Sequence, residues 1–299
     1  MSEDNASEAD TSLCCASCGI AEIDDINMKE CDACDLVRYC SDECRKDHKS
    51  QHEEACNKRA AELRDELLFK QPESSHLGDC PICCLPLPLD QMKSIISCCC
   101  SKAICIGCYF ANHKRELKQR LVPSCAFCRT PISYSSEERD KRMMKRIEAN
   151  DPFATFQEGV DQYENGNYDK AFEWYTKAAE LGSVDGHFHL ACLYHFGHGV
   201  EKNEGKKTHH LEEAAISGHP MARRNLGLHD KNNGNMERAV KHFIIAATLG
   251  LDDAIKALMQ AFKRGHVSTE DLAAALRAYQ DAVDETKSPL RELAGKGLS

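Results

Sequence analysis

Cysteine is the residue type in this chain with the clearest capacity for chemistry. Of 19 cysteines in 299 residues, 18 lie between Cys14 and Cys128, and Cys192 stands alone in the second half. Most form pairs separated by two or three residues, a spacing that lets two side chains bind one tetrahedral zinc ion. Two runs, each with eight potential zinc ligands, predict four Zn²⁺ ions per chain. The runs are Cys15, Cys18, Cys31, Cys34, Cys40, Cys44, His52 and Cys56, then Cys80, Cys83, Cys98, Cys100, Cys105, Cys108, Cys125 and Cys128.

A disulfide framework is the alternative use of so many cysteines, but disulfides persist mainly in oxidising compartments. The residues after Met1, SEDNASEADTS, contain neither the basic nor the apolar run of a secretory leader. No stretch approaches the roughly 18 apolar residues that a membrane span needs. We therefore expect an intracellular protein, cytoplasmic or nuclear, with metal-bound cysteines and no membrane contact.

Charge is unevenly distributed along the chain. The formal charge of −10 is made up of −10 over residues 1–75, +5 over 76–150 and −5 over the remainder. The only basic cluster, Arg139 to Arg146, is typical of one solvated face of a linker helix. Because a chain this acidic is a poor phosphate binder, nucleic-acid binding is not expected.

The zinc ligands of the first run need a helix to position them. From Ser41 to Lys70 the sequence contains no Gly or Pro and has helical spacing. Such a helix places Cys40 and Cys44 one turn apart at its start, and His52 and Cys56 one turn apart further along.

The order and spacing of Cys15 to Cys56, with Tyr39-Cys40-Ser41 at the third pair, resemble the MYND-type zinc finger. The resemblance implies that alternate pairs share an ion, and that short, often proline-rich, peptides bind beside the zinc. Lys49 and Arg45 stand where the family often has Trp and Gln, so the peptide preference does not carry over. The implied ligand sets are Cys15, Cys18, Cys40 and Cys44, and Cys31, Cys34, His52 and Cys56.

The two ends of the second run, Cys80-Pro81-Ile82-Cys83 and Cys125-Ala126-Phe127-Cys128-Arg129-x-Pro131, resemble those of a RING domain. The usual histidine position holds Lys102, a poor zinc ligand because it must lose its proton. The all-cysteine RING variant has the spacing found here, with either Cys98 or Cys99 as the first ligand of the second pair. The resemblance implies two sets: Cys80, Cys83, Cys105 and Cys108, and Cys98 or Cys99 with Cys100, Cys125 and Cys128.

RING domains act as ubiquitin ligases by docking a charged ubiquitin-conjugating enzyme. By resemblance, Ile82, Tyr109 and Pro131 would form the docking groove for that enzyme, and Arg129 would orient ubiquitin. The alternative is a zinc-folded module without a partner enzyme. In that case the first three residues are local packing and Arg129 is a surface charge.

The second half of the chain contains a repeat. WYTKAAELG (174–182), HLEEAAISG (210–218) and HFIIAATLG (242–250) share Ala-Ala-x-x-Gly, at offsets of 36 and 32 residues, the period of a helical solenoid. Each segment reads as a second helix that ends at glycine. Trp174-Tyr175 and Tyr194-x-x-Gly197-x-Gly199 make the repeats resemble Sel-1-like repeats, relatives of the tetratricopeptide repeat.

These patterns predict a multidomain protein, in which two small cross-braced, metal-stabilised α+β zinc modules precede an all-α helical-repeat solenoid. We expect a zinc-binding adaptor that contacts protein partners through the solenoid and the MYND groove. A RING-type ubiquitin ligase with the solenoid as substrate receptor is the alternative, and would be the enzyme if there is one. A zinc-thiolate redox sensor using spare cysteines is a third possibility. The expected segments are an acidic tail (1–12), the MYND finger (13–58, its helix reaching about 70), the RING-like module (77–134), a basic linker helix (135–150), the solenoid (151–287) and a flexible tail (288–299).

Overall fold

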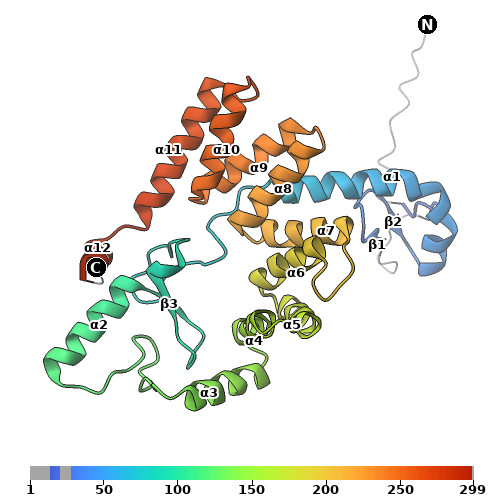
Figure 1. Ribbon diagram of the computed structural model, residues 1–299. Helices are drawn as coiled ribbons and strands as arrows, with labels where there is room; N and C mark the ends of the chain where they lie inside the picture. The colour runs from blue at the N-terminus through green and yellow to red at the C-terminus, as the bar shows by residue number, and fades with distance from the viewer. Residues whose placement is uncertain (1–13, 21–27, 298–299) are drawn as a thin grey trace, which may run out of the picture. The chain divides into compact units, whose positions relative to one another are not determined.

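A computed structural model gives the fold, and it describes residues 14–20 and 28–297 (Figure 1). The chain divides into two compact units, Met1–Lys70 and Gln71–Ser299. The expected acidic tail at 1–12 lies outside the described residues. Small cysteine-rich modules precede an array of helix pairs, which confirms the predicted fold class.

The first unit is a two-stranded hairpin followed by one long helix. Strands β1 (Lys29–Glu30) and β2 (Arg38–Tyr39) pair antiparallel, and α1 spans Asp42–Phe69. Ser41 begins the helix because its hydroxyl accepts a hydrogen bond from the Cys44 backbone N–H at 3.2 Å. The helix thus starts beside one cysteine pair and carries the next pair along its length.

The second unit begins with another cysteine module. A 3₁₀ turn, η2 (Gln91–Lys93), leads into the antiparallel hairpin of β3 (Ser94–Ile96) and β4 (Ala103–Cys105), and α2 (Ile106–Gln119) follows directly. Its small core has Leu87 and Ile104 packed among buried cysteines. An apolar cluster this small provides little hydrophobic stabilisation for the module.

The basic segment after this module forms helix α3 (Ser136–Glu148). Arg142 donates to Glu138 Oε1 at 3.0 Å and to the Pro131 carbonyl at 2.8 Å, and Arg146 pairs with Asp151. These bonds tie α3 back to the cysteine module and forward to the next helix, so part of its positive charge is already compensated.

The repeat region forms three antiparallel helix pairs that pack in sequence. Gly182, Gly218 and Gly250 have positive φ just past the ends of the second helices, as the repeat pattern predicts. The alanines of the repeat are buried between neighbouring helices, so small side chains allow close helix packing. The six helices are α4 (Pro152–Glu164), α5 (Tyr168–Glu180), α6 (Val184–Phe196), α7 (Glu204–Ile216), α8 (Pro220–Asn232) and α9 (Met236–Thr248).

A further helix pair follows the three repeats: α10 (Asp252–Lys263) and α11 (Thr269–Glu285). The expected flexible tail at 288–299 is wrong where the structure describes it, because Pro289–Gly297 forms helix α12. Ala294 is fully buried and Arg291 is 8% exposed. Helix α12 packs against α2 of the cysteine module, a contact that local sequence does not reveal.

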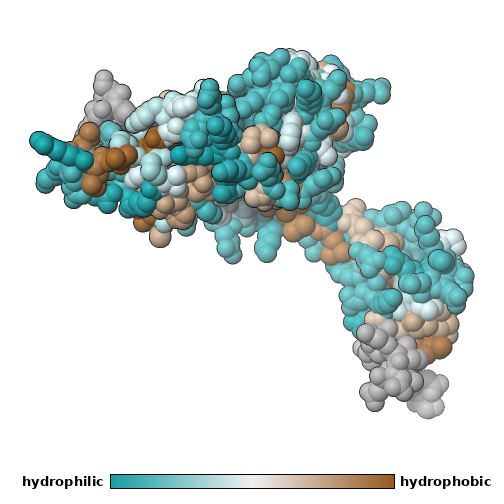
Figure 2. Space-filling view, turned by 90° about the horizontal axis from the view of Figure 1, so that it is seen from below, coloured by the Kyte–Doolittle hydropathy of each residue, from teal (hydrophilic) through white to brown (hydrophobic). Residues whose placement is uncertain are grey.

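The surface seen in Figure 2 is largely hydrophilic, and its apolar side chains are scattered in small groups. Larger exposed apolar residues include Ile82, Phe127 and Phe196. Among the described residues, no helix is both long enough and apolar enough to cross a membrane.

Candidate metal centres

Four clusters of metal-ligand side chains lie in the two cysteine-rich modules. Within each cluster, all ligand atoms lie within 4.8 Å of one another. Along the chain the clusters alternate, so that pairs one and three meet, as do pairs two and four. The clusters are Cys15, Cys18, Cys40 and Cys44; Cys31, Cys34, His52 and Cys56; Cys80, Cys83, Cys105 and Cys108; and Cys99, Cys100, Cys125 and Cys128.

The first cluster is built by the hairpin and the start of α1. Backbone N–H to O bonds from Cys15 to Ile20 and from Ala16 to Arg38 hold the first pair against β2. The Sγ atoms of Cys18 and Cys40 are 3.5 Å apart, and those of Cys40 and Cys44 are 3.7 Å apart.

The second cluster contains the one histidine expected as a ligand. His52 Nε2 lies 3.0 Å from Cys34 Sγ, and Cys31 Sγ lies 3.7 Å from Cys56 Sγ. The neighbouring His48 is outside the cluster; its Nδ1 is 3.1 Å from the Tyr39 hydroxyl, and its ring stacks on that of His52. His48 therefore packs against the cluster and does not belong to the ligand set.

In the second module, the structure places Cys99 in the fourth cluster where the sequence left Cys98 or Cys99 open. Cys99 Sγ is 3.3 Å from Cys128 Sγ, and Cys100 Sγ is 3.9 Å from Cys125 Sγ. The reason is a tight turn: the Ser101 N–H donates to the Ser97 carbonyl at 2.8 Å, and Ser101 has a positive φ of 53°. This turn directs Cys99 and Cys100 inward and leaves Cys98 out. Four cysteines make up the cluster, and Lys102 is exposed.

These distances fit zinc and not disulfides. Zn–S bonds of roughly 2.3 Å put tetrahedral sulfurs about 3.8 Å apart, whereas a disulfide holds them about 2 Å apart. The separations of 3.3 to 3.9 Å are close to the zinc value, and all cysteines are free thiols. A bound Zn²⁺ would draw together the two ends of each module, which have little apolar core of their own.

Opposed pKa shifts within one cluster reflect the packing of four thiols around one point. Burial raises the pKa of Cys80, but backbone N–H groups of Cys105, Cys83 and Ile82 outweigh it and lower that pKa to about 7. Burial, together with the neighbouring Cys105, raises the pKa of Cys108 well above its ordinary value. Four packed thiols cannot all ionise alone, and a divalent cation removes that conflict.

The residues expected to meet a conjugating enzyme lie on the second module. Ile82, Arg129 and Pro131 are exposed, and Tyr109 is half-buried on α2. Arg129 has a φ of 61° and donates to the Asn112 Oδ1 on α2. Its side chain therefore has a partner within the module.

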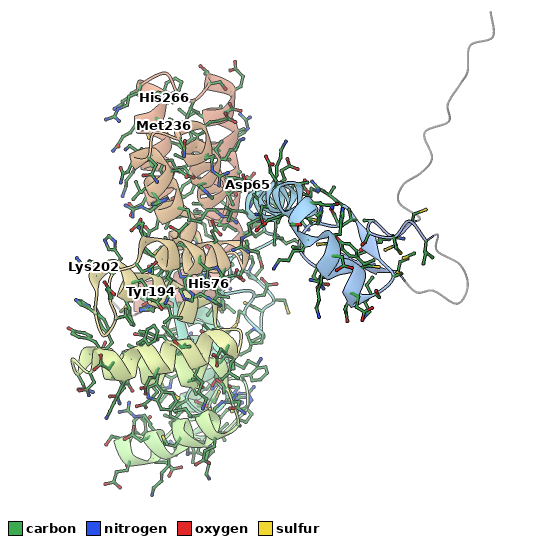
Figure 3. The ribbon with its side chains drawn as sticks, turned by 90° about the vertical axis from the view of Figure 1, so that its right-hand side faces the viewer. Asp65, His76, Tyr194, Lys202, Met236 and His266 are labelled. Carbon is green, nitrogen blue, oxygen red and sulfur yellow. The ribbon has the colours of Figure 1, made fainter. Side chains whose placement is uncertain are left out.

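A fifth group, His76, Asp185 and His219, was missed by the sequence analysis because its members lie far apart along the chain. The Nε2 atoms of His76 and His219 lie 3.3 and 3.6 Å from Asp185 Oδ1, and the two rings stack. Figure 3 labels His76 among the side chains drawn as sticks. His219 Nδ1 accepts the Ala222 N–H at 3.2 Å, which leaves the ring proton on Nε2. A protonated Nε2 has no lone pair for a metal, so we interpret this group as a hydrogen-bonded clasp.

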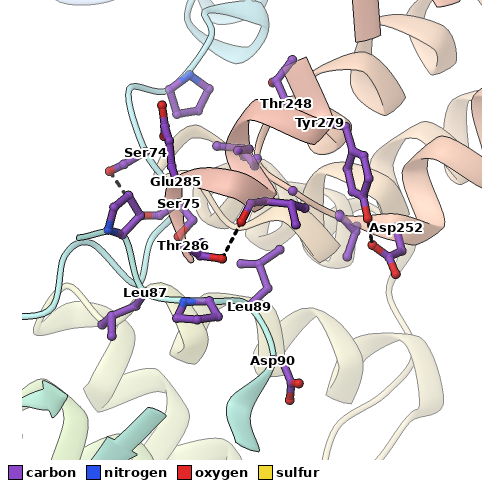
Figure 4. Close-up of a pocket in the computed structure, with 18 of the residues that line it drawn as sticks. Ser74, Ser75, Leu87, Leu89, Asp90, Thr248, Asp252, Tyr279, Glu285 and Thr286 are labelled. Atoms are coloured by element: carbon purple, nitrogen blue, oxygen red, sulfur yellow. Dashed lines mark hydrogen bonds between the residues drawn. The ribbon is translucent and has the colours of Figure 1, made fainter. Parts of the chain in front are cut away.

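The clasp anchors the segment before the second module to the solenoid. The His76 backbone N–H donates to the Gly218 carbonyl at 3.1 Å, and a Cβ at Gly218 would lie 2.7 Å from the Ser74 carbonyl oxygen. Next to this segment lies a cavity of about 850 Å³ (Figure 4). Tyr279 donates to Asp252 in its wall, a bond that raises the pKa of Tyr279 to about 12.

A second hollow lies on the solenoid itself. It is a groove of about 640 Å³ between α6, α7 and α8. Apolar side chains (Ala191, Leu211, Leu228 and the rim residue Phe196) alternate with polar ones. The polar lining residues are Cys192, His195, Glu204, Lys207, Asn225, His229, Asn232 and Asn233.

Comparison with known proteins agrees with this division. The MYND finger model matches residues 15–56, and the Sel1 repeat model matches 156–183, 184–219 and 222–251. A curated relative, an exopolysaccharide production negative regulator of Rhizobium meliloti, is 42% identical over 53 residues. That match covers 18% of this chain and only 20% of the relative.

Two solved structures are also similar. A Sel1 repeat protein from Oxalobacter formigenes is 24% identical, with a TM-score of 0.43, over 60% of this chain and 72% of that one. The protective antigen c5321 of uropathogenic Escherichia coli is 19% identical, with a TM-score of 0.39, over 63% of this chain and 40% of that one. On the matches of the family models, the chain contains a MYND finger followed by three Sel1 repeats.

Proposed function

We propose that the protein is a zinc-stabilised interaction adaptor, with the MYND finger and the Sel1 solenoid holding different protein partners. Both kinds of module fit protein interaction. Zinc at each of the four clusters would fix the two small modules, and the solenoid is held by its own helix packing.

The groove between α6, α7 and α8 is the observation that carries this proposal. Side-chain amides such as those of Asn225 and Asn232 contain both donors and acceptors, which suits the backbone of an extended peptide, although Asn225 Oδ1 also accepts from Arg224 at 3.3 Å. Phe196 is 55% exposed at the rim, where a partner would cover it. The groove therefore fits a peptide segment with apolar side chains better than a rigid globular surface.

A displayed library of random dodecapeptides, selected on the immobilised full chain, tests this directly. Wild type should enrich a consensus that the double variant Asn225→Ala, Asn232→Ala fails to bind. Asn165→Ala, a change to an exposed asparagine on the first repeat, is the matched control and should bind as wild type does. Selection of no consensus, or equal binding by the groove variant, would remove the solenoid groove from the proposal.

A RING-type ubiquitin ligase is the second candidate function. The specific observation in its favour is the alternating order of the third and fourth clusters, together with the exposure of Ile82, Arg129 and Pro131 beside them. In this proposal a conjugating enzyme docks at Ile82, and Arg129 orients the ubiquitin that it carries.

Incubation with activating enzyme, a panel of conjugating enzymes, ubiquitin and ATP tests the ligase proposal. Ile82→Ala should weaken docking, because truncating a buried interface anchor costs about 2 kcal/mol. Arg129→Ala should slow ubiquitin discharge without weakening docking. Arg115 also donates to Asn112 Oδ1, at 3.0 Å, so Arg115→Ala is the matched control and should leave discharge unchanged. A zinc-loaded wild type that binds no enzyme in the panel would eliminate this candidate.

A further inference from the structure

Helix α12 is far from the second cysteine module in sequence but packs directly on it. A Cβ at Gly107 of α2 would lie 2.8 Å from the Arg291 backbone nitrogen and 3.0 Å from the Leu290 carbonyl carbon. Only glycine allows this approach, and Ala294 of α12 is fully buried. The C-terminal helix therefore forms part of the module that begins at Cys80.

The Arg291 side chain enters the loop that carries the first cysteine pair of this module. One terminal nitrogen donates to the carbonyls of Pro86 at 2.7 Å and Thr286 at 2.6 Å. The other donates to the Leu85 carbonyl at 3.1 Å and reaches Cys83 Sγ at 3.5 Å. The guanidinium thus joins the end of the solenoid, the loop and a cysteine of the third cluster.

The chemistry of the two groups is complementary. A buried guanidinium keeps its charge and needs a compensating anion. Within the described residues, no carboxylate forms an ion pair with Arg291, whose bonds go to carbonyls and to sulfur. Four thiolates around Zn²⁺ carry a formal charge of −2, and N–H donors to the sulfurs disperse that charge.

We propose that Arg291 stabilises zinc binding by the cluster of Cys80, Cys83, Cys105 and Cys108. It does so by donating a hydrogen bond to Cys83 Sγ and by compensating the negative charge of the thiolates. The inference rests on zinc occupying that cluster. The contact places helix α12 in the surroundings of the metal site. The Arg291 side chain thereby links the module to the end of the solenoid.

Zinc release from the full chain, followed with a chromophoric chelator, tests this. In Arg291→Gln, about one zinc equivalent should leave on the order of tenfold faster, the effect typical of losing a partner of a metal ligand. The remaining zinc should leave at the wild-type rate. Arg277→Gln, a change to an exposed arginine on α11, is the matched control and should change nothing. Arg291→Lys keeps the charge without the planar fork, and should fall between wild type and Arg291→Gln.

A second variant tests the same contact without touching Arg291 or any cysteine. Gly107→Ala forces α12 away, although alanine is the better helix former within α2. It should speed release of the same equivalent, and alkylation mapped by mass spectrometry should reach Cys80, Cys83, Cys105 and Cys108 earlier than in wild type. Release at the wild-type rate in both Arg291→Gln and Gly107→Ala would overturn the inference. Absence of zinc from the wild-type cluster would instead refute its zinc-binding premise.

Discussion

His76 Nε2 lies 3.3 Å from Asp185 Oδ1, and this contact joins the segment before the second module to the first turn of α6. Burial raises the pKa of Asp185, but hydrogen bonds from His219 and His76 outweigh it and bring that pKa well below its ordinary range. Burial lowers the pKa of His219. The folded protein therefore favours a charged aspartate beside a neutral His219.

Acid should destabilise the second unit in two stages. Burial lowers the pKa of His210 to about 4 and also lowers the pKa values of His187 and His189. As the pH falls from about 6.5 to 4, these histidines become protonated in the unfolded chain before they do so in the folded protein. The free energy of unfolding should therefore fall. Below about pH 4, the unfolded chain binds a proton at Asp185 before the folded protein does. The stability that the depressed pKa of Asp185 provides should therefore be lost as the pH falls further.

Chemical denaturation across this pH range checks the prediction. His210→Gln should flatten the first stage, and Asp185→Asn the second. A free energy of unfolding that rises as the pH falls from 6.5 to 4.5 would contradict the neutral state of these histidines.

The fourth cluster should depend on Cys99 and not on Cys98. Cys99→Ser removes a sulfur that lies 3.3 Å from Cys128 Sγ, so the protein should lose close to one zinc equivalent by elemental analysis. Cys98→Ser and Lys102→Ala should lose none. The reverse pattern for Cys98 and Cys99 would mean that the turn at Ser97 to Ser101 directs Cys98, and not Cys99, toward the other ligands.

Close helix contact in the solenoid should make Gly227 intolerant of a side chain. A Cβ there would lie 2.6 Å from Cε1 of Phe243, which is buried, so Gly227→Ala should cost about 1–3 kcal/mol. At Gly205 of α7 the nearest atom is 3.5 Å away, and Gly205→Ala should be neutral or stabilise by up to about 1 kcal/mol. Thermal unfolding of both variants compares the two, and equal effects would refute the packing argument.

Chelation should unfold the cysteine modules and leave the helix pairs α4 to α11 folded. These helices are held by apolar clusters such as that around Phe243 and Leu258. Helical circular dichroism should therefore fall only in part after EDTA. Complete loss of the helical signal would show that the solenoid also depends on metal.

The sequence predicted the parts of this protein that follow from local spacing. The cysteine pairs indicated zinc modules. Gly182, Gly218 and Gly250 marked helix ends, because the positive φ of a single residue decides where each helix ends. Gly218 has a second role that spacing does not show: the chain at Ser74 passes too close for a Cβ.

Contacts between distant segments could not be predicted. Arg291 reads as an ordinary charge in a polar tail, and only the packing of α12 on α2 brings it to Cys83. Likewise, His76, Asp185 and His219 have no common spacing. The choice of Cys99 over Cys98 depends on the direction of one turn, which three consecutive cysteines leave open.

Native mass spectrometry of the full chain, prepared without chelator, tests the central claim most directly. The four clusters predict a dominant species with four zinc ions and every cysteine reduced. Two or fewer zinc ions, or a mass that shows disulfides in their place, would contradict the account of two zinc-organised modules joined to a Sel1 solenoid.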